Sequence, residues 1–287
     1  MPSERDLRRR AKSVKNIQQL TRAMQLVAAS KMRRAQESVL ASRPFEEKLR
    51  TVLNDLAPYA DPELSPLLQR RDPVKKVSVI LITTDRGLVG PMNVNLLRST
   101  LRWAQEQPAV SYVAAGRKGI ASLRRLRAPV TAEFPGIPDK PTTADTNVIA
   151  RAAVEEFLKG EVDEVHLAFT RFINTLRQEP VIRKLLPLVP EDEDLDDLPP
   201  LQYIFEPDPE TVLNLILPRF VEVAVYQAVL ESKASQFSAQ MVAMRNATDA
   251  AGDLISELAL AANKARQTRI TKEMLEIASG AEAFTKG

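Results

Sequence analysis

The last third of the chain carries an apolar repeat too long for a helix inside a compact domain. Apolar residues recur there at alternating spacings of three and four, and only Gln227 and Thr248 in the series are polar. The pattern lasts about seven heptads and predicts a coiled-coil helix. Asp208 as N-cap and Pro209 at the first helical position mark its start, and no proline follows Pro218. The predicted seam consists of Leu213, Ile216, Phe220, Val223, Gln227, Leu230, Ala234, Phe237, Met241, Met244, Thr248, Ala251, Ile255, Leu258, Ala262 and Ala265.

The first 57 residues predict a second long helix with a less regular stripe. A polar gap interrupts this stripe at Ser42 and Glu46. At 1.5 Å per residue the two helices would be roughly 75 and 105 Å long, so we expect them to pair antiparallel and bury each other's stripe. The predicted stripe consists of Leu7, Ala11, Val14, Ile17, Leu20, Met24, Ala28, Met32, Ala35, Val39, Leu49, Leu53 and Leu56.

The end of the C-terminal helix departs from the repeat. Arg269 and Lys272 stand where the seam would continue, and the apolar row moves to Ile270, Met274 and Ile277, with Ala281 after them. The last third of the seam before this point is rich in alanine, and small side chains let paired helices approach closely. We expect the helix to extend beyond its partner and to contact another protein there.

The middle of the chain alternates strand and helix patterns and contains most of the prolines. Strands are predicted at 75–84, 110–116, 162–174 and 201–207, with helices at 93–106, 119–126 and 147–159 and an acidic loop at 191–200. Such alternation predicts a Rossmann-like α/β domain with a mostly parallel open sheet. The predicted division is 1–57 for the N-terminal coiled-coil helix, 74–206 for the α/β domain and 208–287 for the C-terminal helix.

Composition excludes several classes of site. The chain has no cysteine and one histidine, His166, so neither a thiolate metal site nor a disulfide framework is expected. No nucleophile and base pair stands out, and we expect no catalytic residue, metal or cofactor. The net charge of +3 is nearly balanced. No run of about 18 apolar residues occurs, so direct bilayer insertion is not expected.

Two motifs invite other interpretations. TTDRGLVGP (83–91) follows a strand, as phosphate-binding loops do, but it fits neither glycine consensus, Asp85 would repel phosphate and Pro91 lacks an N–H. The basic stretches 5–12 and 30–36 lack interleaved aromatics, so a solvated face is favoured over nucleic acid, and an acidic protein partner is the third possibility. A coiled-coil adaptor or scaffold and a nucleotide-using enzyme remain the competing functions.

Five segments together resemble the γ subunits of F-type ATP synthases. They are residues 17–36, 84–93, 169–180, 241–255 and 263–283, and ITKEMLEIASGAEA is the most diagnostic among them. The resemblance runs essentially end to end. It implies a non-catalytic rotor, with partners in the α and β subunits, the ε subunit and the membrane c-ring, that couples proton flow to ATP synthesis or hydrolysis.

The resemblance also implies contact residues. Met24, Gln267, Thr271 and Glu273 correspond to contacts with the catalytic ring. Phe205 and Glu206 correspond to contacts with ε and the c-ring. Plain seam packing is an equally good interpretation of Met24.

The chain departs from the family at a few points. Val89-Gly90-Pro91 replaces a common Cys-Gly-Gly, and Gln240 replaces an arginine that often precedes MVAM. The cysteine-bearing segment of chloroplast members is absent. Because no transit peptide is recognisable, we expect a bacterial protein, peripheral on the cytoplasmic face of the plasma membrane.

Overall fold

The computed structural model describes residues 3–56, 65–188 and 209–285. The chain divides into two compact units, Met1–Val27 with Met241–Gly287 and Ala28–Gln240. The predicted strand at 201–207, the acidic loop at 191–200, the proposed N-cap Asp208, and the site residues Phe205 and Glu206 lie outside the described residues. The division of the sequence at 57, 74, 206 and 208 stays a prediction.

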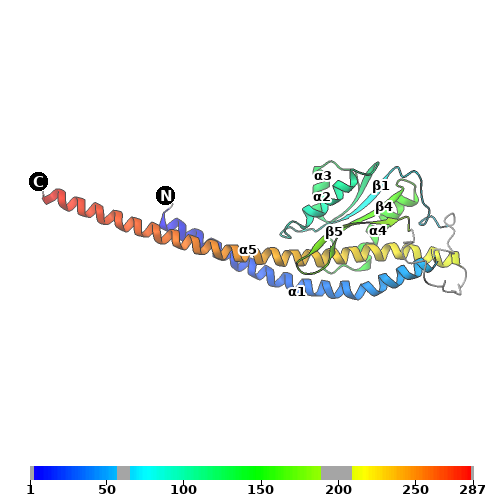
Figure 1. The fold of residues 1–287 in the computed structure, drawn as a ribbon, viewed down its shortest axis with the longest axis horizontal. Coiled ribbons are helices and arrows are strands. Elements are labelled where there is room, and N and C mark those ends of the chain that lie inside the picture. Colours follow the sequence, from blue (N-terminus) through cyan, green and yellow to red (C-terminus); the bar gives the residue numbers. More distant parts are fainter. Residues whose placement is uncertain (1–2, 57–64, 189–208, 286–287) are drawn as a thin grey trace. The chain divides into compact units, whose positions relative to one another are not determined.

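The two long helices predicted from the sequence are present and packed together. Helix α1 spans Glu4–Leu56 and helix α5 spans Pro209–Thr285 (Figure 1). Both helices contribute residues to both units. Pro44 and Pro218 lie inside these helices without ending them. In the smaller unit Glu4 contacts Arg269 and Thr21 contacts Thr248. In the larger unit Lys31 lies over the ring of Phe237 and Ser42 contacts Gln227, so the pairing within each unit is antiparallel.

The larger unit contains a five-stranded mixed sheet. Its order is β3-β2-β1-β4-β5, in which the first four strands are parallel and β5 pairs antiparallel with β4. The mostly parallel open sheet predicted from the sequence is therefore confirmed. The strands span Val77–Ile82 (β1), Val110–Ala115 (β2), Val130–Phe134 (β3), Glu164–Phe172 (β4) and Gln178–Leu186 (β5).

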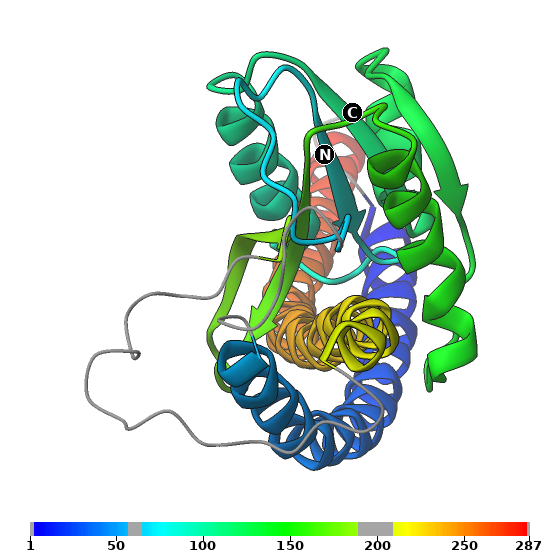
Figure 2. The ribbon, with the colours of Figure 1, turned by 90° about the vertical axis from the view of Figure 1, so that its right-hand side faces the viewer.

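Helices cover both faces of this sheet, and the alternation of side chains along β1 shows how. Ile80 and Ile82 belong to a core shared with α4 (Thr143–Leu158) and α5. Val79 and Leu81 point to the opposite face, which α2 (Met92–Ala104) and α3 (Arg117–Arg125) cover. Every residue of β1 is buried, as expected for a central parallel strand. Figure 2 shows α5 beside the sheet with α1 next to it.

Two strands were not predicted, and each has a physical reason. Strand β3 has only five residues, is only partly buried and pairs on one side with β2 alone. Strand β5 contains Pro180, which argues against a strand unless the strand lies at an edge, and β5 is an edge strand. Short or edge strands lack the continuous apolar run that identified β1.

Helix α4 begins four residues before the predicted start at Asn147. The carboxylate of Asp145 accepts hydrogen bonds of 2.7 Å from both the backbone N–H and the hydroxyl of Thr142. This capping arrangement starts the helix at Thr143, before its apolar stripe becomes visible.

In the smaller unit, the predicted stripe of α1 is wrong at two positions. Ile17 and Leu20 are 54% and 60% exposed, whereas Thr21 is buried and Gln18 is half-buried. The hydroxyls of Thr21 and Thr248 lie 2.8 Å apart, and the amide of Gln18 donates to the carbonyl of Thr248 at 3.3 Å. Polar residues therefore continue the heptad spacing of the seam, and the apolar residues beside them face outward.

The C-terminal seam in the same unit is confirmed. Every predicted seam position from Met241 to Ala265 is buried or half-buried. All residues from 266 to 279 are exposed, including Ile270 (43%), Met274 (66%) and Ile277 (73%). Arg269 reaches Glu4, the first residue of α1, at 3.4 Å. The helix thus continues past the start of its partner with an uncovered apolar row.

One helix in the described part of the chain passes a length and composition test for crossing a membrane. The stretch Thr211–Ser279 in α5 contains an 18-residue window with a mean hydropathy of 1.4, of which 44% is buried within the protein. The apolar residues between Leu213 and Val229 pack against the sheet and α4, which accounts for this composition.

Candidate functional site

A short stretch of α5 in the larger unit is buried on all sides although much of it is polar. All residues from Gln227 to Ser238 are buried, where a coiled-coil helix would normally leave one face to solvent. Buried polar groups require partners, and three different elements supply most of the partners here. The buried polar residues, here called the polar collar, are Gln227, Glu231, Ser232, Lys233, Ser235, Gln236 and Ser238.

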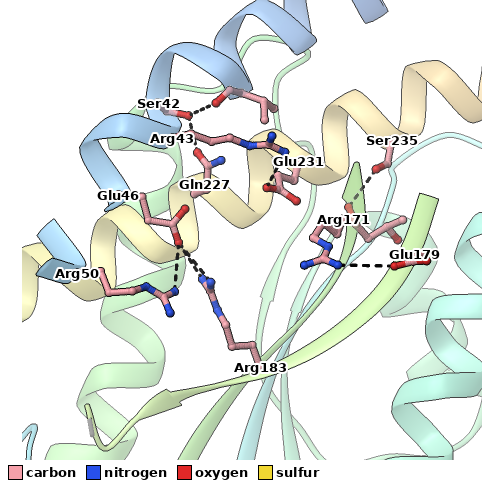
Figure 3. Close-up of polar contacts among 12 residues, drawn as sticks. Ser42, Arg43, Glu46, Arg50, Arg171, Glu179, Arg183, Gln227, Glu231 and Ser235 are labelled. Atoms are coloured by element: carbon pink, nitrogen blue, oxygen red, sulfur yellow. Dashed lines mark hydrogen bonds and ion pairs between the residues drawn. The ribbon is translucent and has the colours of Figure 1, made fainter. Parts of the chain in front are cut away.

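One side of the collar faces α1. The hydroxyl of Ser42 donates to the side-chain oxygen of Gln227, and the guanidinium of Arg43 lies 3.6 Å from Glu231 (Figure 3). Burial raises the pKa of Glu231, and the positive charge of Arg43 opposes that rise. Ser42, which reads as part of a polar gap in the sequence, therefore provides specific pairing between the two helices.

A second side of the collar faces strand β4. The hydroxyl of Ser235 donates to the carbonyl of Thr170 at 3.1 Å, and the N–H of Thr170 donates to Ser232 at 3.4 Å. Ser238 donates to the carbonyl of Thr175, in the turn after β4, at 2.5 Å. These bonds connect α5 to the carboxyl end of a central strand.

A third side of the collar faces the loop between β3 and α4. The ammonium of Lys233 donates to the carbonyl of Ile137 at 2.9 Å. Burial lowers the pKa of Lys233, while the negative charges of Asp85 and Asp139 oppose the shift. Asp139 in turn accepts a hydrogen bond of 2.6 Å from Lys31 of α1. One loop thus contacts both long helices.

An ion pair links α1 directly to the edge of the sheet. The carboxylate of Glu46 lies 3.2 Å from Arg183 of β5 and 3.9 Å from Arg50 (Figure 3). Arg171 and Glu179 pair across β4 and β5 at 3.7 Å. Directional bonds to several elements hold α5 at one rotation about its axis, whereas apolar packing alone tolerates small rotations. This arrangement is suited to transmitting force between the helices and the sheet.

The structure argues against phosphate binding at the loop after β1. The carboxylate of Asp85 accepts hydrogen bonds from the backbone N–H groups of Arg117 (3.1 Å) and Gly136 (2.9 Å). These are the donors that an anion at the carboxyl end of the sheet would use. Gly116 has φ +95°, and a Cβ there would lie 2.2 Å from the carbonyl oxygen of Thr83. A glycine is therefore needed at this position because the backbone of Thr83 approaches it closely.

The site residues predicted in the smaller unit do not form one cluster. Gln267 and Thr271 share one face of α5, at an open surface groove of about 520 Å³ that Lys264, Thr268, Lys272 and Leu275 also line. Glu273 lies on another face and pairs with Arg269 at 3.1 Å. Met24 is half-buried in α1, one turn from Thr21, which pairs with Thr248 of α5. At 1.5 Å per residue, Thr248 and Gln267 are about 30 Å apart along α5, so Met24 lies far from Gln267.

Reasoning from the sequence missed the residues of α1 that hold the collar. Ser42 and Glu46 read as an interruption of a stripe, and Arg43 was not singled out. The available signal was the polar Gln227 in the opposite seam, since polar positions in paired helices usually meet each other. Among the residues that the structure describes, no three His, Cys, Asp or Glu lie together as a metal site.

Comparison with known proteins gives a consistent result along the whole chain. A family model described as ATP synthase matches residues 3–284. The ATP synthase gamma chain of Dehalococcoides mccartyi strain CBDB1 is 50% identical over 290 residues, covering 99% of this chain and 100% of that protein. The gamma chain of Roseiflexus castenholzii is 46% identical over 291 residues, with full coverage of both.

Solved structures share the fold at low sequence identity. A chain of the Euglena gracilis mitochondrial ATP synthase, solved with OSCP, F1 and the c-ring, matches with a TM-score of 0.72 at 19% identity, covering 98% of this chain and 94% of that one. A chain of the Tetrahymena thermophila mitochondrial ATP synthase central stalk and c-ring matches with a TM-score of 0.62 at 23% identity, covering 79% and 99%.

Proposed function

This chain belongs to the ATP synthase gamma-chain family, as the non-catalytic central-stalk subunit, and from that premise we propose how it works. It turns within a ring of catalytic α and β subunits and couples proton flow to ATP synthesis or hydrolysis. An asymmetric surface that selects a different conformation of each catalytic subunit at each angle converts differential binding into work. The observation that carries this proposal is the exposed end of α5 beyond Ala265.

The uncovered end of α5 supplies the contact with the catalytic ring. An exposed apolar row on a helix gains free energy when another protein covers it. Gln267 and Thr271 add hydrogen-bonding groups on a neighbouring face. Glu273 contributes less, because its carboxylate is already paired with Arg269. Met24 acts through its position in α1, either by packing in the seam or by touching the ring.

The remaining partners and the location follow from the same proposal. The ε subunit and the c-ring bind the larger unit, with Phe205 and Glu206 as the candidate contacts. No nucleic acid partner and no direct bilayer insertion are part of the function. The bacterial relatives support a peripheral position on the cytoplasmic face of the plasma membrane.

Assembly with cognate subunits tests this function. The chain, produced together with the α and β subunits of the same organism, is expected to co-purify as one complex. That complex should hydrolyse ATP faster than either the isolated chain or the αβ mixture. Purification of the chain as a homodimer that leaves α and β behind would favour the coiled-coil adaptor instead.

A further inference from the structure

The outer face of α2 has a composition unusual for a solvent-facing helix surface. Residues 94, 97, 98, 101, 102 and 105 form one stripe along it and line an open hollow of about 450 Å³. At about 100° per residue this stripe lies opposite the buried residues Met92, Leu96 and Thr100. Most of the stripe therefore faces away from the sheet, and Leu97 at its margin also packs against the core beneath α2.

The stripe has an apolar edge and a cationic edge. Val94 is 54% exposed, and Leu97 and Leu101 follow it at spacings of three and four, each only half-buried. Arg98 and Arg102 lie along the other edge of the stripe. They form no hydrogen bond or ion pair with any residue in the described part of the chain. Surface helices normally turn polar residues, not an apolar stripe at this spacing, toward water.

The helices on this side of the larger unit carry an excess of positive charge. Helices α2 and α3 lie side by side over one sheet face (Figure 1). They contain six arginine or lysine residues and no aspartate or glutamate, and two of the six, Arg117 and Arg124, pair with Asp85 and Glu133 of neighbouring segments. The chain as a whole is nearly balanced, with 40 basic and 37 acidic residues. Such a surface attracts an acidic partner and repels a basic one.

We propose that the outer face of α2 docks an amphipathic helix of another protein, whose apolar stripe covers Val94, Leu97 and Leu101 and whose acidic edge pairs with Arg98 and Arg102. Apolar residues at spacings of three and four are what a second helix packs against, and the flanking charges select the partner and its direction. A protein helix fits better than a lipid surface, because the cationic side chains lie along one edge only.

Binding of designed peptides to the full-length chain tests the proposal independently of ATP synthase assembly. The probe is a fluorescent 18-residue helix with leucines at spacings of three and four and glutamates along one edge. Its controls are the same helix with lysines for glutamates and an acidic peptide with scrambled leucines. Fluorescence anisotropy should show binding of the first peptide at least about tenfold tighter than of either control.

Matched variants of the chain identify the surface. Arg98→Glu with Arg102→Glu should weaken binding of the acidic helix at least about tenfold and strengthen binding of the lysine version. Lys140→Glu with Arg151→Glu makes the same charge change at exposed positions elsewhere in this unit and should leave binding unchanged. Equal loss in both double variants, or equal binding of the scrambled peptide, would show general charge attraction and overturn the proposal.

Two further measurements decide between a protein and a membrane. Vesicles containing phosphatidylglycerol should compete poorly with the acidic helix, and vesicle binding without peptide binding would overturn the proposal. In the assembled complex, a photo-reactive residue at Val94 should cross-link to a helical segment with acidic residues on one edge. A cross-link to lipid only, or none in a complex that is otherwise active, would contradict it.

Discussion

At the scale of single residues, Arg43 and Glu231 form the charged contact between the collar and α1. Glu231 is buried, and Arg43 is the cation that faces it from α1 at 3.6 Å. Arg43→Met should lower the free energy of unfolding by about 1–3 kcal/mol, below the range for a fully buried pair because the Arg43 side chain is 39% exposed. The double variant with Glu231→Gln should recover part of that loss in urea unfolding at pH 7. A double variant as unstable as the sum of the two single variants would show that the pair is not coupled.

The same carboxyl makes a pH-dependent contribution to stability. Because burial raises the pKa of Glu231 in the folded chain, the folded state holds this proton more tightly than the unfolded state. The stabilising effect of protonation is full below the ordinary pKa of 4.5 and is lost as the pH rises through the folded pKa. The free energy of unfolding should therefore fall less steeply above pH 4.5 in Glu231→Gln than in the unchanged protein, as measured by urea unfolding at a series of pH values. An identical pH profile in the variant would exclude this assignment.

At the scale of elements, the sequence predicted the two long helices, three of the four parallel strands and the uncovered end of α5. The predictions failed where a polar residue occupies a buried position of the stripe. Gln18 and Thr21 keep the three-and-four spacing of the seam, but their polarity favoured Ile17 and Leu20, which are exposed. Glu46 read as a gap because its partner Arg183 lies 137 residues away, on an edge strand that Pro180 concealed.

The pairing of α1 with α5 can be tested by cross-linking, since the chain has no cysteine of its own. Thr21→Cys with Thr248→Cys should form a disulfide under mild oxidation, because the two hydroxyls lie 2.8 Å apart. The pair Thr21→Cys with Ile255→Cys, displaced by two turns, should not. Mass spectrometry after oxidation separates the two outcomes. Equal cross-linking of both pairs would contradict the pairing of Thr21 with Thr248.

The two faces of the exposed end of α5 should differ in function. Gln267→Ala with Thr271→Ala should leave the fold unchanged, because both side chains are exposed. Loss of about 1 kcal/mol of contact with the catalytic ring would slow ATP hydrolysis of the assembled complex about fivefold. Glu273→Ala, on another face, serves as the control and should have a smaller effect. A larger effect of Glu273→Ala would reverse the assignment of the contact face.

At the scale of the whole molecule, the chain combines two features that a rotor requires. One is a long helix whose end is uncovered and free to bind other subunits. The other is a collar that fixes this helix against α1, β4 and the loop after β3 within the larger unit. A helix anchored in this way resists turning within its own domain, so torque applied to the domain passes to the helix.

Observing the rotation of the chain in the assembled complex tests most directly whether this chain is the rotor. A single cysteine introduced at the exposed position Arg151 would carry a gold particle, with the chain assembled into an immobilised complex of its cognate α and β subunits. On addition of ATP the particle is predicted to turn continuously in one direction, at a rate that follows ATP hydrolysis. A complex that hydrolyses ATP at its normal rate while the particle stays fixed would contradict the assignment of this chain as the rotor.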